Sequence, residues 1–306
     1  MNKCNLLSFI FMLTLAVAIT SGCSRGQQNG HGTAGKNIQI KGSDTIVNLV
    51  QAWAEEFTKR NPVVNIGVTG GGSGTGFAAL LNGTCDIGMS SRLIDPKEIV
   101  KAKANGIQPV EYKVGLDGLA VVVHPDNPVH NLTLDNLRDI FMARKKNWKD
   151  FGGENRKIVI LSRESNSGTH VFFKEHVLKR GNTKSPEEFS PEALLMPSSQ
   201  AIADEVQQNP HAIGYVGMGY ICQALKAVAV AVEPGKPFIE PNVETVMDGS
   251  YPISRPLFLY TNGEPTDYIK IFVDYALSES GQKMVKDTDF VPIGGIGDEK
   301  NKRLCY

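Results

Sequence analysis

The sequence predicts an α/β fold in which strands alternate with helices and pair in parallel, in two domains between which the chain passes more than once. Three observations predict it. The 306 residues are long for one domain and comfortable for two, and the apolar fraction of 41% allows a real core. Segments with strand spacing alternate with segments of helix spacing. No single long linker divides the chain.

The first 22 residues read as an export signal. Lys3 precedes an apolar run from Leu6 to Ile19, which is short for a membrane span. Small residues then lead to Cys23, as in a bacterial lipoprotein signal, although Thr20 stands where an aliphatic residue is usual. We expect lipidation of Cys23, with ordinary secretion as the alternative. The polar, glycine-rich residues 23–36 would then tether an extracytoplasmic protein to the membrane.

Charge and cysteine content exclude several classes of protein. Lys3 is the only charged residue among residues 1–22, so the mature chain keeps 31 of the 32 basic residues and all 32 acidic ones. No basic block indicates a nucleic-acid partner. Cys85, Cys222 and Cys305 remain in the body, so at least one thiol has no partner within the chain. CxxC and metal-type spacings are absent, and no cofactor or metal is predicted.

The first third of the chain reads as strands followed by helices. Apolar residues between Ile46 and Phe57 recur at spacings of three and one, which predicts an amphipathic helix with Trp53 in the core. A later helix has Asp95 as its N-cap and Pro96 at its first position. The expected elements are strand 38–41, a helix within residues 42–62 that stops near Asn61, strand 63–69, glycine-rich loop 69–76, a short helix, strand and loop 85–92, and helix 95–106.

The remaining elements continue the alternation. A near-continuous apolar strand begins at Asp117, which suits burial on both faces. His170 and His176 lie in a predicted helix without metal-type partners, and we interpret both as structural. The expected elements are strand 117–125, helix 133–143, strand 157–163, helix 168–181, helix 198–210, strand 212–217, strand 256–260 and helix 267–281.

Four turns share a pattern of glycine and hydroxyl residues directly after a predicted strand. They are residues 42–45 (GSDT), 70–76 (GGGSGTG), 88–92 (GMSSR) and 162–169 (SRESNSGT). The carboxyl ends of strands are where ligands bind in open α/β sheets. Two of the turns carry an arginine, Arg92 and Arg163. Their hydroxyls, free amides and guanidinium groups would suit a small tetrahedral oxyanion, whose every acceptor needs a donor once dehydrated.

Each turn also has a plainer interpretation. The loop at residues 70–76 fits neither a P-loop, because Phe77 stands where lysine should be, nor a dinucleotide or nucleophile-elbow motif. It can be a tight connection that tolerates positive φ. Ser43 or Asp44 can be a helix N-cap, and Arg163 can pair with Glu164 on the surface. Ser90 and Ser91 can bond within their own loop.

These motifs together resemble one family. The segments GSDT…WAEEF, GGGSGTGFAALLNGTCDIGMSSR, SRESNSGTHVFF and AIGYVG are similar to the phosphate-binding proteins of bacterial phosphate ABC transporters, over about residues 38 to 293. The resemblance implies a two-lobed periplasmic-binding-protein fold of type II-like form that closes on one phosphate ion. It also implies a discontinuous first lobe, residues 37–116 and 252–306, around a second lobe, residues 117–251.

Carried over motif by motif, the resemblance implies a set of phosphate ligands. They are Ser43, Asp44, Thr45, Ser73, Gly74, Ser90, Ser91, Arg92, Arg163, Ser167, Gly168 and Thr169. In the best-known branch of the family an aspartate, which accepts the proton of hydrogen phosphate, stands where this chain has Ser91. We hypothesise that Asp44 supplies that acceptor here and so selects phosphate over sulfate.

The resemblance implies a receptor that hands phosphate to a membrane permease. We expect it to be a monomer, anchored to the membrane through the predicted lipid on Cys23. No pattern pairs a nucleophile with a base, so we expect no enzyme activity. The alternatives are a receptor for sulfate, molybdate or tungstate, a phosphate sensor, and a secreted phosphatase.

Overall fold

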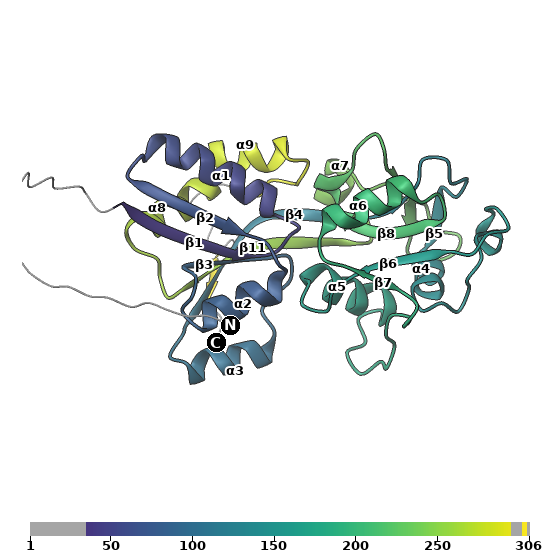
Figure 1. Ribbon diagram of the computed structural model, residues 1–306, viewed down its shortest axis with the longest axis horizontal. Coiled ribbons are helices and arrows are strands. Elements are labelled where there is room, and N and C mark those ends of the chain that lie inside the picture. Colours follow the sequence, from purple (N-terminus) through teal and green to yellow (C-terminus); the bar gives the residue numbers. More distant parts are fainter. Residues whose placement is uncertain (1–34, 295–301, 305–306) are drawn as a thin grey trace, which may run out of the picture. The chain divides into compact units, whose positions relative to one another are not determined.

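The computed structural model describes residues 35–294 and 302–304 (Figure 1). The first part of the chain contains β1 (Lys36–Gly42), α1 (Val47–Arg60), β2 (Val64–Thr69), α2 (Ser73–Leu81), β3 (Ile87–Ser90) and α3 (Pro96–Ala104). The chain then continues through β4 (Pro109–Val123), and the segment that returns to this part forms β11 (Ser254–Asn262), α8 (Asp267–Leu277), α9 (Glu279–Asp287) and β12 (Lys302–Leu304).

The segment between β4 and β11 builds the other half of the fold. Its strands are β5 (Asn131–Thr133), β6 (Val159–Arg163), β7 (Leu194–Met196), β8 (Ala212–Gly217), β9 (Lys226–Ala227) and β10 (Ala229–Ala231). Its helices are α4 (Leu134–Phe141), α5 (Gly168–Phe173), α6 (Ser199–Gln208) and α7 (Val243–Met247), with a π-helical turn η2 (Lys174–Leu178) and the 3-10 turns η1 (Trp148–Phe151) and η3 (Met218–Tyr220).

The strands join in the order β2-β1-β3-β11-β4-β8-β6-β7. β1 pairs in parallel with β2 and β3, and β6 pairs in parallel with β7 and β8, whereas the short strands β9 and β12 run antiparallel to β4. The expectation of parallel pairing is wrong at the centre, where β11 runs antiparallel to β3 and β4, and β4 runs antiparallel to β8. A continuous apolar run indicates burial on both faces but carries no information on strand direction.

The long strand β4 connects the two halves. Its residues from Pro109 to Gly118 pair with β11, and those from Leu119 to Val123 pair with β8. The expected strand began only at Asp117, since the alternating, partly polar residues before it lack an apolar run. Figure 1 shows β4 and β11 running between the two groups of elements. The chain therefore adopts the two-lobed α/β fold, while the exact lobe boundaries stay a prediction.

Local rules explain the helices that bear on the site. Trp53 of α1 is fully buried, and its indole N–H donates to the Gly281 carbonyl at 2.9 Å, which confirms it as core. Asp95 caps α3 in a reciprocal capping box with Glu98. The single helix expected over residues 267–281 is wrong: Ser278 ends α8 and caps α9 by accepting the Gly281 N–H. The helix expected from residue 168 likewise passes from α5 into the π-helical turn η2.

Several predictions concern the ends of the chain. The signal, Cys23, Cys305 and nearly all of the tether lie outside the described residues; β1 begins at Lys36, one residue inside the predicted tether. Cys85 and Cys222 are free thiols, and burial raises the pKa of the Cys85 thiol to about 11. Over residues 35–294 and 302–304, no helix has both the length and the apolar character needed to cross a membrane.

Candidate functional site

The candidate site is built from four turns that follow strands. Ser43, Asp44 and Thr45 connect β1 to α1, and Ser73 begins α2 after β2. Ser91 follows β3, and Thr169 lies in the first turn of α5 after β6. Parallel pairing of β1 with β2 and β3 brings the first three turns to one edge of the sheet.

The side chains of Thr45, Ser73, Ser91 and Thr169 meet in one place, which we call the hydroxyl cluster. The Thr45 and Thr169 Oγ1 atoms lie 2.9 Å apart. The Ser91 Oγ atom lies 3.5 Å from that of Thr45 and 3.4 Å from that of Ser73, and the Ser91 N–H donates to Ser73 at 3.1 Å. All four residues are buried. Segments far apart in the sequence therefore converge on one set of hydroxyl groups.

Glycine at position 168 allows the closest approach in the cluster. A Cβ atom there would lie 2.3 Å from the Ser73 Oγ and 2.9 Å from the Ser91 Oγ. Gly72 is comparable, with φ of +92° and a would-be Cβ 2.8 Å from the Asn166 carbonyl. The glycines of the two loops thus let α2 and α5 meet at their first turns.

Asp44 and Arg163 form a buried ion pair beside the cluster. An Arg163 Nη2–Asp44 Oδ2 distance of 2.6 Å joins two turns that are 119 residues apart. Arg163 also donates to the Ser199 hydroxyl and to the carbonyls of Met196 and Pro197. Its pairing with Asp44 in the interior means that the surface pair with Glu164 is not formed.

A second buried ion pair, Arg255 with Asp117, was not predicted. Arg255 of β11 donates from Nε and Nη2 to Asp117 Oδ2 at 3.0 and 2.8 Å, and neither side chain has exposed surface. Arg255 also donates to the Thr45 and Thr169 hydroxyls. The available signal was a charged residue at the start of each predicted apolar strand, Asp117 as the first residue of strand 117–125 and Arg255 directly before strand 256–260, since a charge that becomes buried there requires a partner.

The remaining predicted ligands lie near the cluster but have other partners. The Ser43 hydroxyl accepts the Thr45 N–H, and the Ser167 hydroxyl caps α5 by accepting the His170 N–H. The Gly74 N–H donates to the Asn166 carbonyl at 2.9 Å. Ser43, Ser167 and Gly74 therefore stabilise the turns that carry the hydroxyl cluster, and none of these three contacts is with a cluster hydroxyl.

Ser90 and Arg92 have hydrogen-bond partners other than the hydroxyl cluster. The Ser90 hydroxyl donates to the Arg92 carbonyl at 2.7 Å. Arg92 donates to both carboxylate oxygens of Glu98 at 2.8 Å and lies over the Phe77 ring. No hydrogen bond that we observe joins either side chain to the hydroxyl cluster among residues 35–294. The bidentate pair instead ties the loop after β3 to the start of α3.

His170 belongs to a polar network behind Arg163. Its Nδ1 lies 3.3 Å from the Ser162 Oγ, which in turn lies 2.7 Å from the Tyr215 hydroxyl. Burial lowers the pKa of His170 to about 4, and the nearby Lys174 adds to the shift. The imidazole is therefore neutral near pH 7 and supports the turn as a structural residue.

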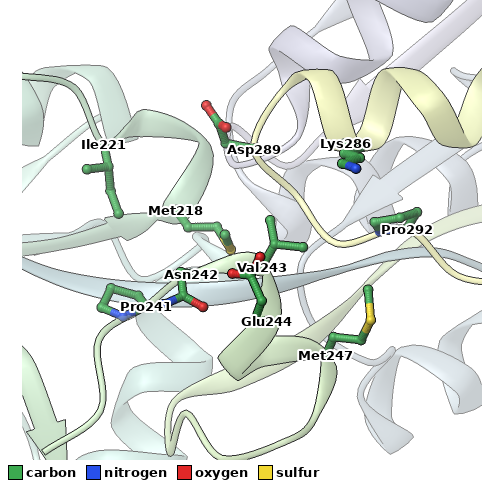
Figure 2. A pocket seen from close by; sticks show the side chains of 10 residues that line it. All are labelled: Met218, Ile221, Pro241, Asn242, Val243, Glu244, Met247, Lys286, Asp289 and Pro292. Atoms are coloured by element: carbon green, nitrogen blue, oxygen red, sulfur yellow. The ribbon is translucent and has the colours of Figure 1, made fainter.

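A separate groove lies along residues 218–221, 241–247 and 286–292, with a volume of about 630 Å³ (Figure 2). None of the residues predicted to bind the ion lines it. Met218 links the groove to the Arg255–Asp117 pair, because its backbone N–H donates to Asp117 Oδ1 at 3.0 Å. Among the described residues, no group of three or more His, Cys, Asp or Glu side chains could hold a metal ion.

The fold and the buried polar cluster define a class of protein, and the comparisons agree. The model of the PBP superfamily domain matches residues 27–280. The class is therefore that of the periplasmic-binding-protein-like receptors.

Individual relatives point to one family within this class. Phosphate-binding protein PstS of Pseudomonas aeruginosa is 34% identical over 302 residues, covering 93% of this chain and 91% of its own length. Phosphate-binding protein PstS of Bacillus subtilis is 33% identical and covers 94% of this chain and 92% of its own length. The chain belongs to this PstS family of phosphate-binding proteins.

A solved structure agrees with the assignment. It is a putative phosphate ABC transporter substrate-binding protein with bound phosphate from Clostridium perfringens, with 33% sequence identity and a TM-score of 0.76. The match covers 84% of this chain and all of that one.

Proposed function

We propose that this protein captures inorganic phosphate outside the cytoplasm and delivers it to the permease of a phosphate ABC importer. One observation carries the proposal: in a chain of the PstS family, four turns bring their hydroxyls together in a buried cluster, flanked by Arg163 and Arg255. Phosphate is a tetrahedral anion that needs many donors when it leaves water, and hydroxyl and guanidinium groups supply them.

The proposed ligand groups are the Thr45, Ser73, Ser91 and Thr169 hydroxyls, together with Arg163 and Asp44. Two groups can be ranked lower by their contacts: Arg92 is engaged by Glu98, and the Ser90 hydroxyl by its own loop. Ser43, Gly74, Ser167 and Gly168 would shape the turns and offer further donors if the turns move on binding. Phosphate would bind to one lobe and be enclosed by the other, a shift in population driven by contacts made only in the closed state.

Phosphate itself is favoured over other oxyanions by the acceptor on Asp44, which suits an anion that carries a proton. Isothermal titration calorimetry with phosphate, sulfate and molybdate tests this on protein stripped of bound ions by unfolding and refolding. We expect one phosphate per chain, and binding of sulfate and molybdate weaker by a factor of about 100 or more, the difference expected for an unpaired buried acceptor. Tighter binding of sulfate or molybdate would overturn the assignment of the ligand.

The alternative function from another class is a phosphatase that binds phosphate through the same hydroxyl cluster. A phosphatase assay with an aryl phosphate and added Mg²⁺, Mn²⁺ or Zn²⁺ separates the two. Turnover that follows the concentration of purified protein would overturn the receptor proposal. We expect none, because catalysis would need a nucleophile activated by a base or by two metal ions.

We further propose that Cys23 is lipidated and that the receptor works as a tethered monomer. Detergent partitioning of full-length protein expressed in a bacterial host, against a Cys23→Ala variant, tests the anchor. The lipidated form enters the detergent phase and the variant stays in the aqueous phase. Loss of phosphate uptake in a strain without the protein would distinguish transport from a purely sensing role.

A further inference from the structure

The Arg255–Asp117 pair occupies the place where β4 and β11 lie side by side. Its two residues come from adjacent strands, paired in register at Arg255 and Asp117. Burial raises the pKa of Asp117 and lowers that of Arg255, while the contact between the two opposes both shifts. With Met218 donating to the other Asp117 oxygen, the carboxylate is fixed from two sides. The guanidinium group of Arg255 is therefore held in one orientation.

From that position Arg255 reaches two different turns. Its Nη2 donates to the Thr45 Oγ1 at 3.2 Å and to the Thr169 Oγ1 at 3.1 Å. Its Nη1 donates to the Ser91 carbonyl at 3.2 Å, and the guanidinium carbon lies 5.6 Å from the Phe172 ring centre. Thr45 follows β1, whereas Thr169 and Phe172 belong to α5. One side chain thus contacts both sides of the hydroxyl cluster.

The direction of these hydrogen bonds matters for an anion. A hydroxyl group has one hydrogen and two acceptor positions, and guanidinium N–H groups can only donate. Arg255 therefore occupies an acceptor position on each threonine and turns the hydroxyl hydrogens away from itself. A hydroxyl that accepts from a cation also donates more strongly. Because Asp117 neutralises the arginine, the pair orients these donors without adding net charge.

We propose that Arg255, held by Asp117, is a positioning residue of the phosphate site, which aims the Thr45 and Thr169 hydroxyl hydrogens at the bound ion. The proposal rests on the proposed function. In this proposal β4 and β11, which connect the two lobes, also take part in recognising phosphate. The sequence motifs for phosphate contain neither residue.

The test removes both charges together. The double variant Arg255→Met, Asp117→Asn leaves no unpaired buried charge, and the amide oxygen can still accept the Met218 N–H. By calorimetry we expect its phosphate Kd to rise about 10- to 100-fold, the loss expected for charge-assisted hydrogen bonds. A wild-type Kd in this variant would overturn the proposal.

Two further variants separate positioning from folding and from charge. Arg138→Met, Glu187→Gln removes another, partly buried ion pair that makes no contact with the cluster, and its Kd should stay at the wild-type value. Arg255→Lys keeps the positive charge, but an ammonium group cannot reach Asp117 and both threonines at once. We expect it to weaken binding as well, with the thermal midpoint of the ion-free protein within a few degrees of wild type.

Wild-type affinity in Arg255→Lys would overturn the positioning role even if the double variant failed to fold. Wild-type protein that binds no phosphate in the same titration would instead overturn the proposed function. The two failures are therefore distinguishable in one series of measurements.

Discussion

At the scale of single residues, Asp44 bears most directly on ion selectivity. Its two oxygens accept from the Gly71 N–H at 2.8 Å and from Arg163 at 2.6 Å. A carboxylate has about four acceptor positions, so two of them remain for another donor. The proton of hydrogen phosphate can supply that donor, whereas sulfate would place an oxygen with no proton against a carboxylate.

We expect Asp44→Asn to lower the preference for phosphate over sulfate by about 100-fold, because the amide removes both the charge and one acceptor. Competition calorimetry with the two ions measures the ratio. Ser199→Ala is the matched control, since Ser199 also contacts Arg163 but lies outside the hydroxyl cluster. An equal loss of preference in Ser199→Ala would mean that Asp44 acts only through Arg163. An unchanged ratio in Asp44→Asn would refute its role in selectivity.

His170 gives a prediction on stability. Its pKa is lowered to about 4 in the folded protein by burial, against about 6.5 for an unfolded histidine. Between these values the unfolded chain binds the additional proton, so the folded state loses stability as the pH falls. The contribution is fully present above about pH 6.5 and amounts to about 3 kcal/mol across the interval.

Urea unfolding at pH 7 and pH 4.5 measures this loss. His170→Gln, which cannot take up a proton, should lose less stability over that interval than the wild type. His130→Gln changes an exposed histidine and serves as the control. Equal losses in wild type and His170→Gln would show that burial of His170 does not control the acid sensitivity.

At the scale of elements, local patterns predicted the turns and missed the ion pair between strands. The Ser43–Thr45 turn follows a strand and precedes a helix. A turn of this kind can be predicted from a few adjacent glycine and hydroxyl residues. Arg255 and Asp117 are 138 residues apart, so their pairing depends on the antiparallel register of β11 on β4. No local rule specifies that register.

Arg92 is the reverse case, a residue whose neighbours in sequence matched the motif but whose side chain bonds elsewhere. Glu98 stands at the third position of α3, where it completes the capping box with Asp95. That same carboxylate accepts from both Arg92 Nη atoms. The sequence therefore also allowed another interpretation, in which Arg92 pairs with the capping glutamate six residues later and does not bind the ligand.

The contact between α2 and α5 yields a prediction at this scale. The Asn166 side chain donates to the Gly71 carbonyl at 2.9 Å and to the Thr75 hydroxyl at 3.3 Å. Asn166→Ala removes these bonds between the two loops and leaves the hydroxyl cluster in place. We expect phosphate to dissociate about 5-fold faster, as for the loss of about 1 kcal/mol from the closed state.

Stopped-flow release of phosphate to a second binding protein in excess measures that rate. Asn65→Ala is the control, because within residues 35–294 the Asn65 side chain bonds only to Asn37 of the neighbouring strand. A dissociation rate in Asn166→Ala that matches Asn65→Ala would show that this contact does not hold the closed state.

At the scale of the whole molecule, the site joins turns that come from parts of the chain far apart in the sequence. A small set of side-chain contacts joins residues 43–91 to residues 163–220: Asp44 with Arg163, Thr45 with Thr169, Asn166 with Gly71 and Thr75, and Tyr220 with the Asp44 carbonyl. β4 and β11 provide the covalent connection. Bending in these two strands would open the site.

That arrangement predicts coupled protection from hydrogen exchange. If phosphate closes the two lobes, amides in residues 70–76 and 164–170 should be protected together, because each loop becomes buried against the other. The α3 helix, which has no contact with the cluster, should exchange at the same rate with and without phosphate. Mass spectrometry of peptides after exchange, at several phosphate concentrations, would measure the protection of both segments. Both should follow one binding curve, and sulfate at the same concentrations should protect neither. Protection confined to one loop would mean that the ion binds to a single lobe, and the hinge mechanism would then be wrong.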